Sequence, residues 1–115
     1  MRFGFVVLIG IALIGAARGA EAIPEYDSAK FCSNTSALWT GNMKAAMESS
    51  CQKREDEYRA KVRRVWTQTP DDIIDGCVKL ATFGPGGPSY QGLGGCLSLG
   101  VGAAWLDGKV TIARP

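Results

Sequence analysis

The sequence contains no histidine, and this absence argues against the most common active sites. Serine and cysteine hydrolases normally need a histidine that takes the proton from the nucleophile. A pair of carboxylates could still act as in a glycosidase, and the candidates are Glu48, Glu55, Asp72 and Asp75. Each of them stands where a helix surface or a helix start would place an acid. We therefore expect no enzymatic activity and assign no catalytic residue.

Closely spaced cysteines are also missing. Structural zinc ligands normally come as C-x2-C pairs, and disulfide exchangers present a C-x-x-C motif at a helix start. The four cysteines, Cys32, Cys51, Cys77 and Cys96, are instead separated by 19, 26 and 19 residues. We therefore expect no metal site, no redox pair and no cofactor.

A surplus of charge of one sign is absent as well. Of the 13 basic and 11 acidic residues, Arg2, Arg18 and Glu21 belong to an amino-terminal segment, residues 1–22, that we expect to be removed. The remaining 11 basic and 10 acidic residues give a net charge of +1. A nearly neutral domain has no field that draws it onto a nucleic acid, so we expect no nucleic-acid partner.

The amino-terminal residues have the pattern of a secretory signal peptide. Arg2 gives a positive start, residues 3–17 are apolar or glycine, and Ala20-Glu21-Ala22 fits the small-residue rule for signal peptidase. A membrane-spanning helix needs about 20 apolar residues, and this run is shorter, although an uncleaved anchor is the alternative. We predict cleavage near Ala22, a mature chain without a transmembrane segment, and a periplasmic or extracellular location.

An even number of cysteines in a short exported chain indicates disulfide bonds. We favour Cys32 with Cys51 and Cys77 with Cys96, so that each bond staples one helical hairpin. Crossed pairings stay open, because connectivity does not follow from sequence alone. The two equal intervals, offset by 45 residues, indicate two helical-hairpin repeats. In the chain-entropy model each bond stabilises the domain by about 3 kcal/mol.

Helical spacing of apolar residues predicts a mainly α fold, a small disulfide-stapled bundle of about four helices. The expected helices cover residues 26–33, residues 42–66 with Asn42 as cap, residues 70–82 with Thr69 as cap and Pro70 as first residue, and residues 90–106 with Ser89 as cap. Asp107-Gly108 ends the stapled domain, which spans residues 23–108, and residues 109–115 form a tail.

The last helix is the weakest prediction, because five glycines interrupt it. A glycine inside a helix costs about 0.5–1 kcal/mol relative to alanine, so this helix needs tertiary packing and a disulfide to hold it. The surrounding stretch, residues 80–106, carries no charged side chain. It is either the buried half of the domain or a surface that docks a partner.

The segment 48–64 is dense in charge. Glu55 with Arg59 and Glu57 with Lys61 have the i,i+4 spacing of stabilising helical pairs, which favours a solvated helix face. The alternative is an anionic envelope surface bound by the basic helix 53–64. In that case Arg59, Arg63 and Arg64 are the candidate binding residues.

Part of the chain resembles a group of small exported four-cysteine proteins of rhizobial-type bacteria. The resemblance covers roughly residues 24–106 and rests on Cys51 with Glu55, Trp66, Pro70, Cys77, Ala81, the turn 84–88, Ser89-Tyr90, Leu93 and Cys96. The pattern of the group has an acidic residue four positions after the second cysteine of each unit, and Gly100 stands there in the second unit. The resemblance implies a bacterial periplasmic or extracellular setting and no assigned activity. Through Cys51-x3-Glu55 the chain is also similar to lysozyme-inhibitor-type periplasmic domains.

We therefore predict an exported, non-enzymatic domain that binds a protein or an envelope component. The rival hypotheses are the anionic-surface binder described above and a lysozyme-inhibitor-like periplasmic protein.

Overall fold

The computed structural model describes residues 23–109, in which helices are joined by turns and irregular segments and no strand occurs. The helices are α1 (Ser28–Thr35), α2 (Gly41–Val65), the short 3-10 helix η3 (Trp66–Gln68), α3 (Asp71–Thr82), α4 (Tyr90–Val101) and α5 (Ala103–Leu106). The mainly α class is confirmed. The predicted signal peptide and residues 110–115 of the tail lie outside the described residues. No helix between residues 23 and 109 combines the length and apolarity needed to cross a membrane.

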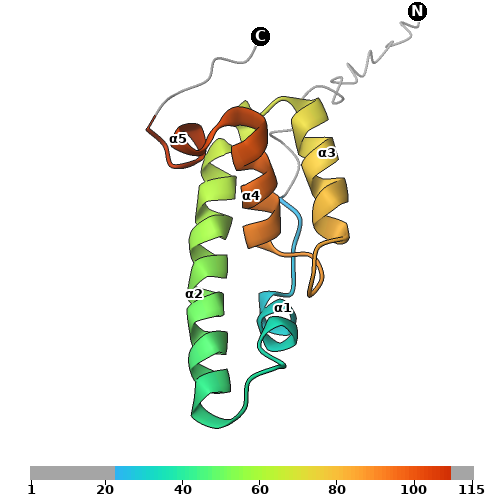
Figure 1. The fold of residues 1–115 in the computed structure, drawn as a ribbon. Helices are drawn as coiled ribbons and strands as arrows, with labels where there is room; N and C mark the ends of the chain where they lie inside the picture. Colours follow the sequence, from blue (N-terminus) through green and yellow to red (C-terminus); the bar gives the residue numbers. More distant parts are fainter. Residues whose placement is uncertain (1–22, 110–115) are drawn as a thin grey trace, which may run out of the picture.

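The long helix α2 organises the molecule (Figure 1). Helix α1 packs against the first half of α2, and α4 packs against its second half. Helix α3 lies on the other side of α4, so α4 is in the middle of this three-helix layer. The short α5 folds back over the carboxyl end of α2. The arrangement leaves one end of the molecule with only α1 and α2.

Two disulfide bonds join the helices in the pairs that we favoured from the sequence. Cys32 of α1 is bonded to Cys51 of α2, with Cα atoms 5.6 Å apart, and Cys77 of α3 to Cys96 of α4, with Cα atoms 5.5 Å apart. Each bond therefore staples two consecutive helices. The paired helices are unequal in the first unit (8 and 25 residues) and equal in the second (12 and 12). A duplication stays a prediction.

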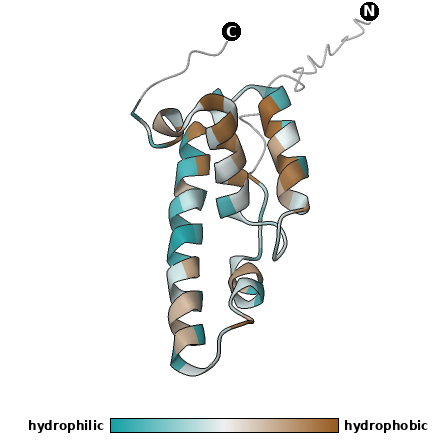
Figure 2. Ribbon diagram, viewed as in Figure 1, coloured by the Kyte–Doolittle hydropathy of each residue, from teal (hydrophilic) through white to brown (hydrophobic). Residues whose placement is uncertain are grey.

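The hydrophobic core lies between α2, α3, α4 and α5 (Figure 2). It consists of Val62, Val65, Trp66, Ile74, Cys77, Ala81, Leu93, Leu97, Trp105 and Leu106. From the uncharged stretch 80–106, the core takes Ala81, Leu93, Leu97, Trp105 and Leu106, while Leu80, Phe83 and Leu99 are exposed. This stretch therefore supplies part of the core and part of the surface.

Glycines let α4 approach its neighbours closely. A Cβ atom on Gly94 would collide with the ring of Tyr58 on α2. A Cβ atom on Gly100 would come within 2.9 Å of Ile73 Cγ2 on α3. Tertiary packing thus compensates for the low helix propensity that the sequence predicts here. At Gly102 the backbone takes φ 101°, which separates α4 from α5 and is unfavourable for other residues.

Of the three residues predicted to cap helix starts, Ser89 is confirmed, and Asn42 and Thr69 are wrong. Ser89 caps α4 by accepting a hydrogen bond from the backbone N–H of Gly92 at 2.9 Å. Asn42 lies inside α2, whose cap position is Thr40. Pro70, predicted as the first residue of α3, is its cap residue, and Thr69 donates its hydroxyl to the carbonyl of Val65 at 2.8 Å. Thr69 is fully buried, so its hydroxyl needs a partner close at hand.

Candidate functional site

A buried carboxylate joins three helices. Glu55 of α2 has no exposed surface. Its Oε1 accepts hydrogen bonds from Ser28 Oγ of α1 at 2.9 Å and from the backbone N–H of Tyr90 at 3.0 Å. Its Oε2 accepts from the backbone N–H of Gln91 at 2.8 Å. The predicted solvated pair of Glu55 with Arg59 is therefore wrong, because Glu55 faces inward.

The position of Glu55 completes the amino-terminal cap of α4. The first N–H groups of a helix have no partner within the helix, and they form its positive end. Glu55 takes the first two of these groups, those of Tyr90 and Gln91. Ser89 takes the third, that of Gly92, with its hydroxyl, and its carbonyl accepts the first regular helical hydrogen bond, from the N–H of Leu93. The carboxylate is thus fully engaged in holding α4 against α2.

The segment before α1, residues 23–27, is bound to the domain and is called the strap below. The hydroxyl of Tyr90 donates to the carbonyl of Pro24 at 2.9 Å and accepts from the backbone N–H of Tyr26 at 3.1 Å. The rings of Tyr26 and Tyr90 are in contact, with centroids 5.0 Å apart. Burial, and secondarily the neighbouring Tyr90, raises the pKa of Tyr26. Together these contacts tie the strap to the start of α4.

The three arginines predicted to bind an anionic surface do not act as one group. Arg59 forms an ion pair with Glu25 of the strap, in which its Nη2 donates to both carboxylate oxygens at 3.1 and 3.2 Å. Arg64 donates to the carbonyl of Leu106 at 2.6 Å. Arg63 is exposed. Two of the three guanidinium groups therefore fasten the two ends of the described chain to α2.

Lys61, between these arginines, is paired with Asp107 beyond α5. The ammonium and the carboxylate are 2.9 Å apart. Its hydrogen bond to Lys61 holds the pKa of Asp107 below its ordinary value of 3.8. The same hydrogen bond raises the pKa of Lys61, with a smaller contribution from the charge of Glu57. The expected pair of Glu57 and Lys61 is thus replaced by a tertiary contact.

The four acids considered for a catalytic pair lie on two helices, two on each. Glu48 and Glu55 belong to α2, whereas Asp72 and Asp75 belong to α3, and α4 lies between these helices (Figure 1). Glu48 is 3.7 Å from Lys44 on the helix surface. Among residues 23–109 no three His, Cys, Asp or Glu side chains are grouped so that they could hold a metal ion.

Two hollows flank α1. The larger, called the strap groove, has a volume of about 400 Å³ and is lined by Glu25, Tyr26, Asp27, Lys30, Phe31, Asn34, Gly86, Gly87 and Pro88. Most of its polar groups serve the fold. Glu25 pairs with Arg59, Asp27 accepts from the N–H of Lys30 at 2.9 Å, and Asn34 donates to the carbonyl of Gly86 at 3.2 Å.

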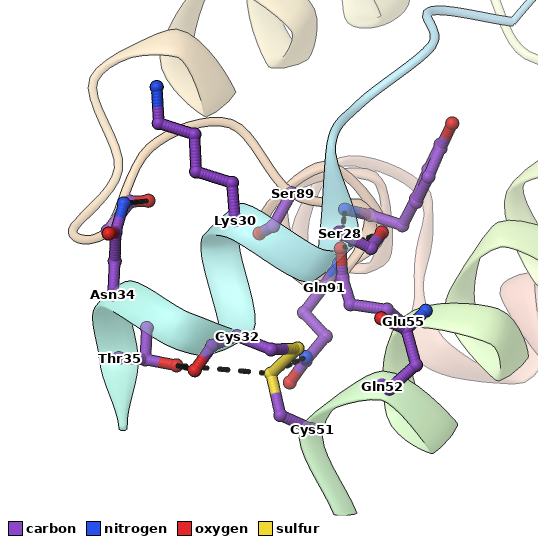
Figure 3. The surroundings of a disulfide bond; sticks show 12 residues. Ser28, Lys30, Cys32, Asn34, Thr35, Cys51, Gln52, Glu55, Ser89 and Gln91 are labelled. Atoms are coloured by element: carbon purple, nitrogen blue, oxygen red, sulfur yellow. Dashed lines mark hydrogen bonds between the residues drawn. A yellow bond between two sulfur atoms is a disulfide. The ribbon is translucent and has the colours of Figure 1, made fainter. Parts of the chain in front are cut away.

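The smaller hollow, called the disulfide pocket, lies beside the Cys32–Cys51 bond. Its volume is about 210 Å³, and it is lined by Phe31, Thr35, Ser36, Trp39, Met47, Cys51, Arg54 and Gln91. In Figure 3, Thr35 and Gln91 reach the sulfur of Cys51 from two sides. Lys30 and Asn34 point away from the bond, toward the strap groove.

Exposed apolar residues lie next to the disulfide pocket, in the turn after α1 and at the start of α2. They are Leu38, Trp39 and Met43, with 95%, 45% and 49% of their surface exposed, and they are called the apolar tip below. Trp66 and Trp105, by contrast, are buried in the core. Trp39 belongs both to the apolar tip and to the wall of the pocket.

Sequence reasoning placed Glu55 on a solvated helix face and so missed its burial and its role at the start of α4, and it missed the apolar tip. A signal for Glu55 exists, because it falls on the apolar stripe of α2, four residues after Cys51 and three before Tyr58. A charged residue at a core-facing position needs a buried partner. The sequence indicates the apolar tip more weakly. Leu38 and Trp39 are two large apolar residues in a stretch without helical periodicity, where no helix face would bury them.

Comparison with known proteins adds no relative. No protein-family model, no curated protein and no solved structure matches the chain. Membership of a group of exported four-cysteine proteins and the similarity to lysozyme-inhibitor-type domains therefore stay predictions.

Proposed function

We propose that the mature protein is an exported, non-enzymatic domain that binds a protein of the cell envelope or its surroundings. The binding surface is the end of the molecule formed by α1 and the first half of α2. The observation that carries the proposal is the exposure of the apolar tip beside the disulfide pocket. Single exposed apolar residues are ordinary, but here three lie close together in the sequence, and one of them, Trp39, lines a pocket.

The composition of this surface is typical of protein interfaces. Trp, Met and Arg are enriched at interfaces, and Trp and Arg dominate the residues whose truncation costs most binding energy. Here Trp39, Met43, Met47 and Arg54 occur within one turn and the following half-helix. A partner that covered Trp39 and Leu38 would remove their apolar surface from water, which supplies the main driving force of association.

The disulfide bond gives this end of the molecule a fixed shape. Helix α1 has only eight residues and would be marginal alone. Cys32–Cys51 holds it to α2, and the Ser28–Glu55 hydrogen bond fixes it a second time. A surface that is ordered before binding loses less conformational entropy on association.

The rival surface on the basic helix has less support. Arg59 and Arg64 are already engaged with Glu25 and with the carbonyl of Leu106. An anionic membrane or polymer would therefore have to compete with contacts that hold the strap and the carboxyl end. The same reasoning disfavours catalysis by Glu55, because all its hydrogen bonds serve the start of α4.

The proposal is tested by capture from an envelope extract under oxidising conditions, with purified tagged protein. Trp39→Ala removes the central residue of the surface. Leu99→Ala is the matched control, since Leu99 is 91% exposed and lies on α4, away from α1. We expect the wild type and Leu99→Ala to retain the same protein and Trp39→Ala to lose it. Equal retention by all three, or no specific retention by the wild type, would contradict the proposal.

A further inference from the structure

Arg54 is the one charged residue in the wall of the disulfide pocket. Within residues 23–109 its guanidinium makes no ion pair and no side-chain hydrogen bond. This distinguishes it from Arg59 and Arg64 on the same helix, whose guanidinium groups hold other parts of the chain. A guanidinium with free donors at the wall of a pocket can bind a carboxylate by donating two parallel hydrogen bonds to it.

The charges of the domain are divided between its two ends. Residues 27–54, which form α1 with its cap Asp27 and the first half of α2, contain Lys30, Lys44, Lys53 and Arg54 against Asp27 and Glu48, a net charge of +2. The other described residues, 23–26 and 55–109, contain six basic and eight acidic residues, a net charge of −2. The end that carries the apolar tip is thus the positive end. Such a field favours an acidic partner and speeds its association.

The size of the disulfide pocket limits what can enter it. Sites for small-molecule ligands usually have volumes of about 300–1,000 Å³, and this pocket has about 210 Å³. It therefore suits a single side chain rather than a cofactor. Its wall is mixed, with Phe31, Trp39 and Met47 as apolar residues and Thr35, Ser36, Arg54 and Gln91 as polar ones. An apolar side chain that enters the pocket would pack against the first three, and a carboxylate next to it would meet Arg54.

We propose that the partner presents an acidic segment whose apolar side chain enters the disulfide pocket and whose neighbouring carboxylate pairs with Arg54. This inference rests on the proposed function and specifies its partner. An anionic bilayer would satisfy the positive charge, but it has no side chain that fills a pocket of this shape. The pocket therefore favours a protein segment over a membrane.

The test uses a phage-displayed library of random peptides selected on the oxidised wild-type protein, with binding of the enriched peptides measured by fluorescence polarisation. We expect the enriched peptides to share an Asp or Glu next to an apolar residue. Arg54→Glu should weaken their binding by about tenfold or more, the loss expected when one member of a close charge pair is reversed. Trp39→Ala should weaken it as well. Circular dichroism confirms that each variant is folded.

Lys53→Glu is the matched control. It makes the same change of charge on the neighbouring residue, which is exposed and does not line the pocket. We expect it to change the affinity by less than about threefold, because a charge outside the contact is screened by solvent and salt. Equal losses in both variants would mean that only the general field matters, and would overturn the pairing with Arg54. Enriched peptides without acids, or no enrichment, would overturn it too.

Binding to lipid vesicles tests the remaining alternative, which is that the positive end binds an anionic membrane. Vesicles of phosphatidylglycerol and phosphatidylcholine should not retain the wild-type protein at physiological salt. Retention that Arg54→Glu and Lys53→Glu weaken equally would replace the protein segment with a lipid surface. If Trp39→Ala loses the envelope protein while Arg54→Glu keeps it, the proposed function stands and the acidic partner is wrong.

Discussion

At the scale of single residues, the carboxylate of Glu55 connects α1, α2 and α4. Replacing Glu55 with Gln keeps the size of the side chain but removes the charge and one acceptor oxygen, so at least one buried N–H group or hydroxyl loses its partner. We expect Glu55→Gln to lower the free energy of unfolding by about 1–3 kcal/mol, the cost of an unsatisfied buried group. Urea denaturation of the disulfide-intact protein measures this loss.

Glu57→Gln is the control for Glu55→Gln, because Glu57 is exposed on the same helix. Exposed substitutions of this kind usually change stability by less than about 0.5 kcal/mol. Equal stability of the two variants would contradict the structural role of Glu55.

The pair of Lys61 and Asp107 gives a prediction that depends on pH. Lys61 holds the pKa of Asp107 below 3.8. A carboxylate with a lowered pKa in the folded state stabilises the fold above its ordinary pKa, and this contribution is lost as the pH falls through the lowered value. In Lys61→Gln the pKa of Asp107 should rise toward 3.8. A carboxyl-detected NMR titration measures it, and an unchanged pKa would show that the ion pair is absent in solution.

At the scale of elements, α4 is a helix that its sequence favours only weakly. Alanine is the better helix former by about 1 kcal/mol, so the space around each glycine decides the effect of a substitution. Gly94→Ala would drive a methyl group into the ring of Tyr58, whereas a Cβ on Gly95 meets nothing within 4 Å. We expect Gly94→Ala to destabilise the domain by about 1–3 kcal/mol and Gly95→Ala to stabilise it by about 0.5–1 kcal/mol.

These two neighbouring substitutions control for each other, because they share the helix and the residue change. Thermal unfolding of both variants and the wild type measures the two changes in stability. Stabilisation by both would mean that α4 does not pack closely against α2.

The sequence predicts some elements well because their signals are local. The turn 84–88 ends α3 at Thr82, and Ser89 begins α4, as expected from residues that break or cap helices. Thr69 was misassigned because its burial, which depends on the whole fold, decides where its hydroxyl bonds. The partners of Glu55 were missed for the same reason, since Tyr90 and Gln91 are 35 and 36 residues away in sequence. Distant pairs of this kind leave no periodic pattern.

The candidate site was less predictable than the fold. Charge density drew attention to residues 53–64, but charge alone does not show which arginines are already engaged. Arg54 is distinguished from Arg59 and Arg64 only by its surroundings, because the strap and the end of α5 reach the other two. The hollow beside Cys51 likewise depends on how α1 lies across α2.

At the scale of the whole molecule, two covalent bonds support a small core. Both bonds close loops of the same sequence separation, 19 residues. The chain-entropy model therefore predicts nearly equal losses, about 3 kcal/mol each, for Cys32→Ala with Cys51→Ala and for Cys77→Ala with Cys96→Ala. Denaturation of the two double variants measures these losses. A variant as stable as the wild type would show that its bond does not support the fold.

Trypsin cleavage without reductant, followed by mass spectrometry, tests the central claim most directly, because each cysteine falls on its own tryptic peptide. Cys32 lies on residues 31–44, Cys51 on 45–53, Cys77 on 65–79 and Cys96 on 80–109. Two stapled helix pairs predict that 31–44 is linked to 45–53 and that 65–79 is linked to 80–109. A link between either of the first two peptides and either of the last two, or four free thiols, would contradict the architecture and the binding surface built on it.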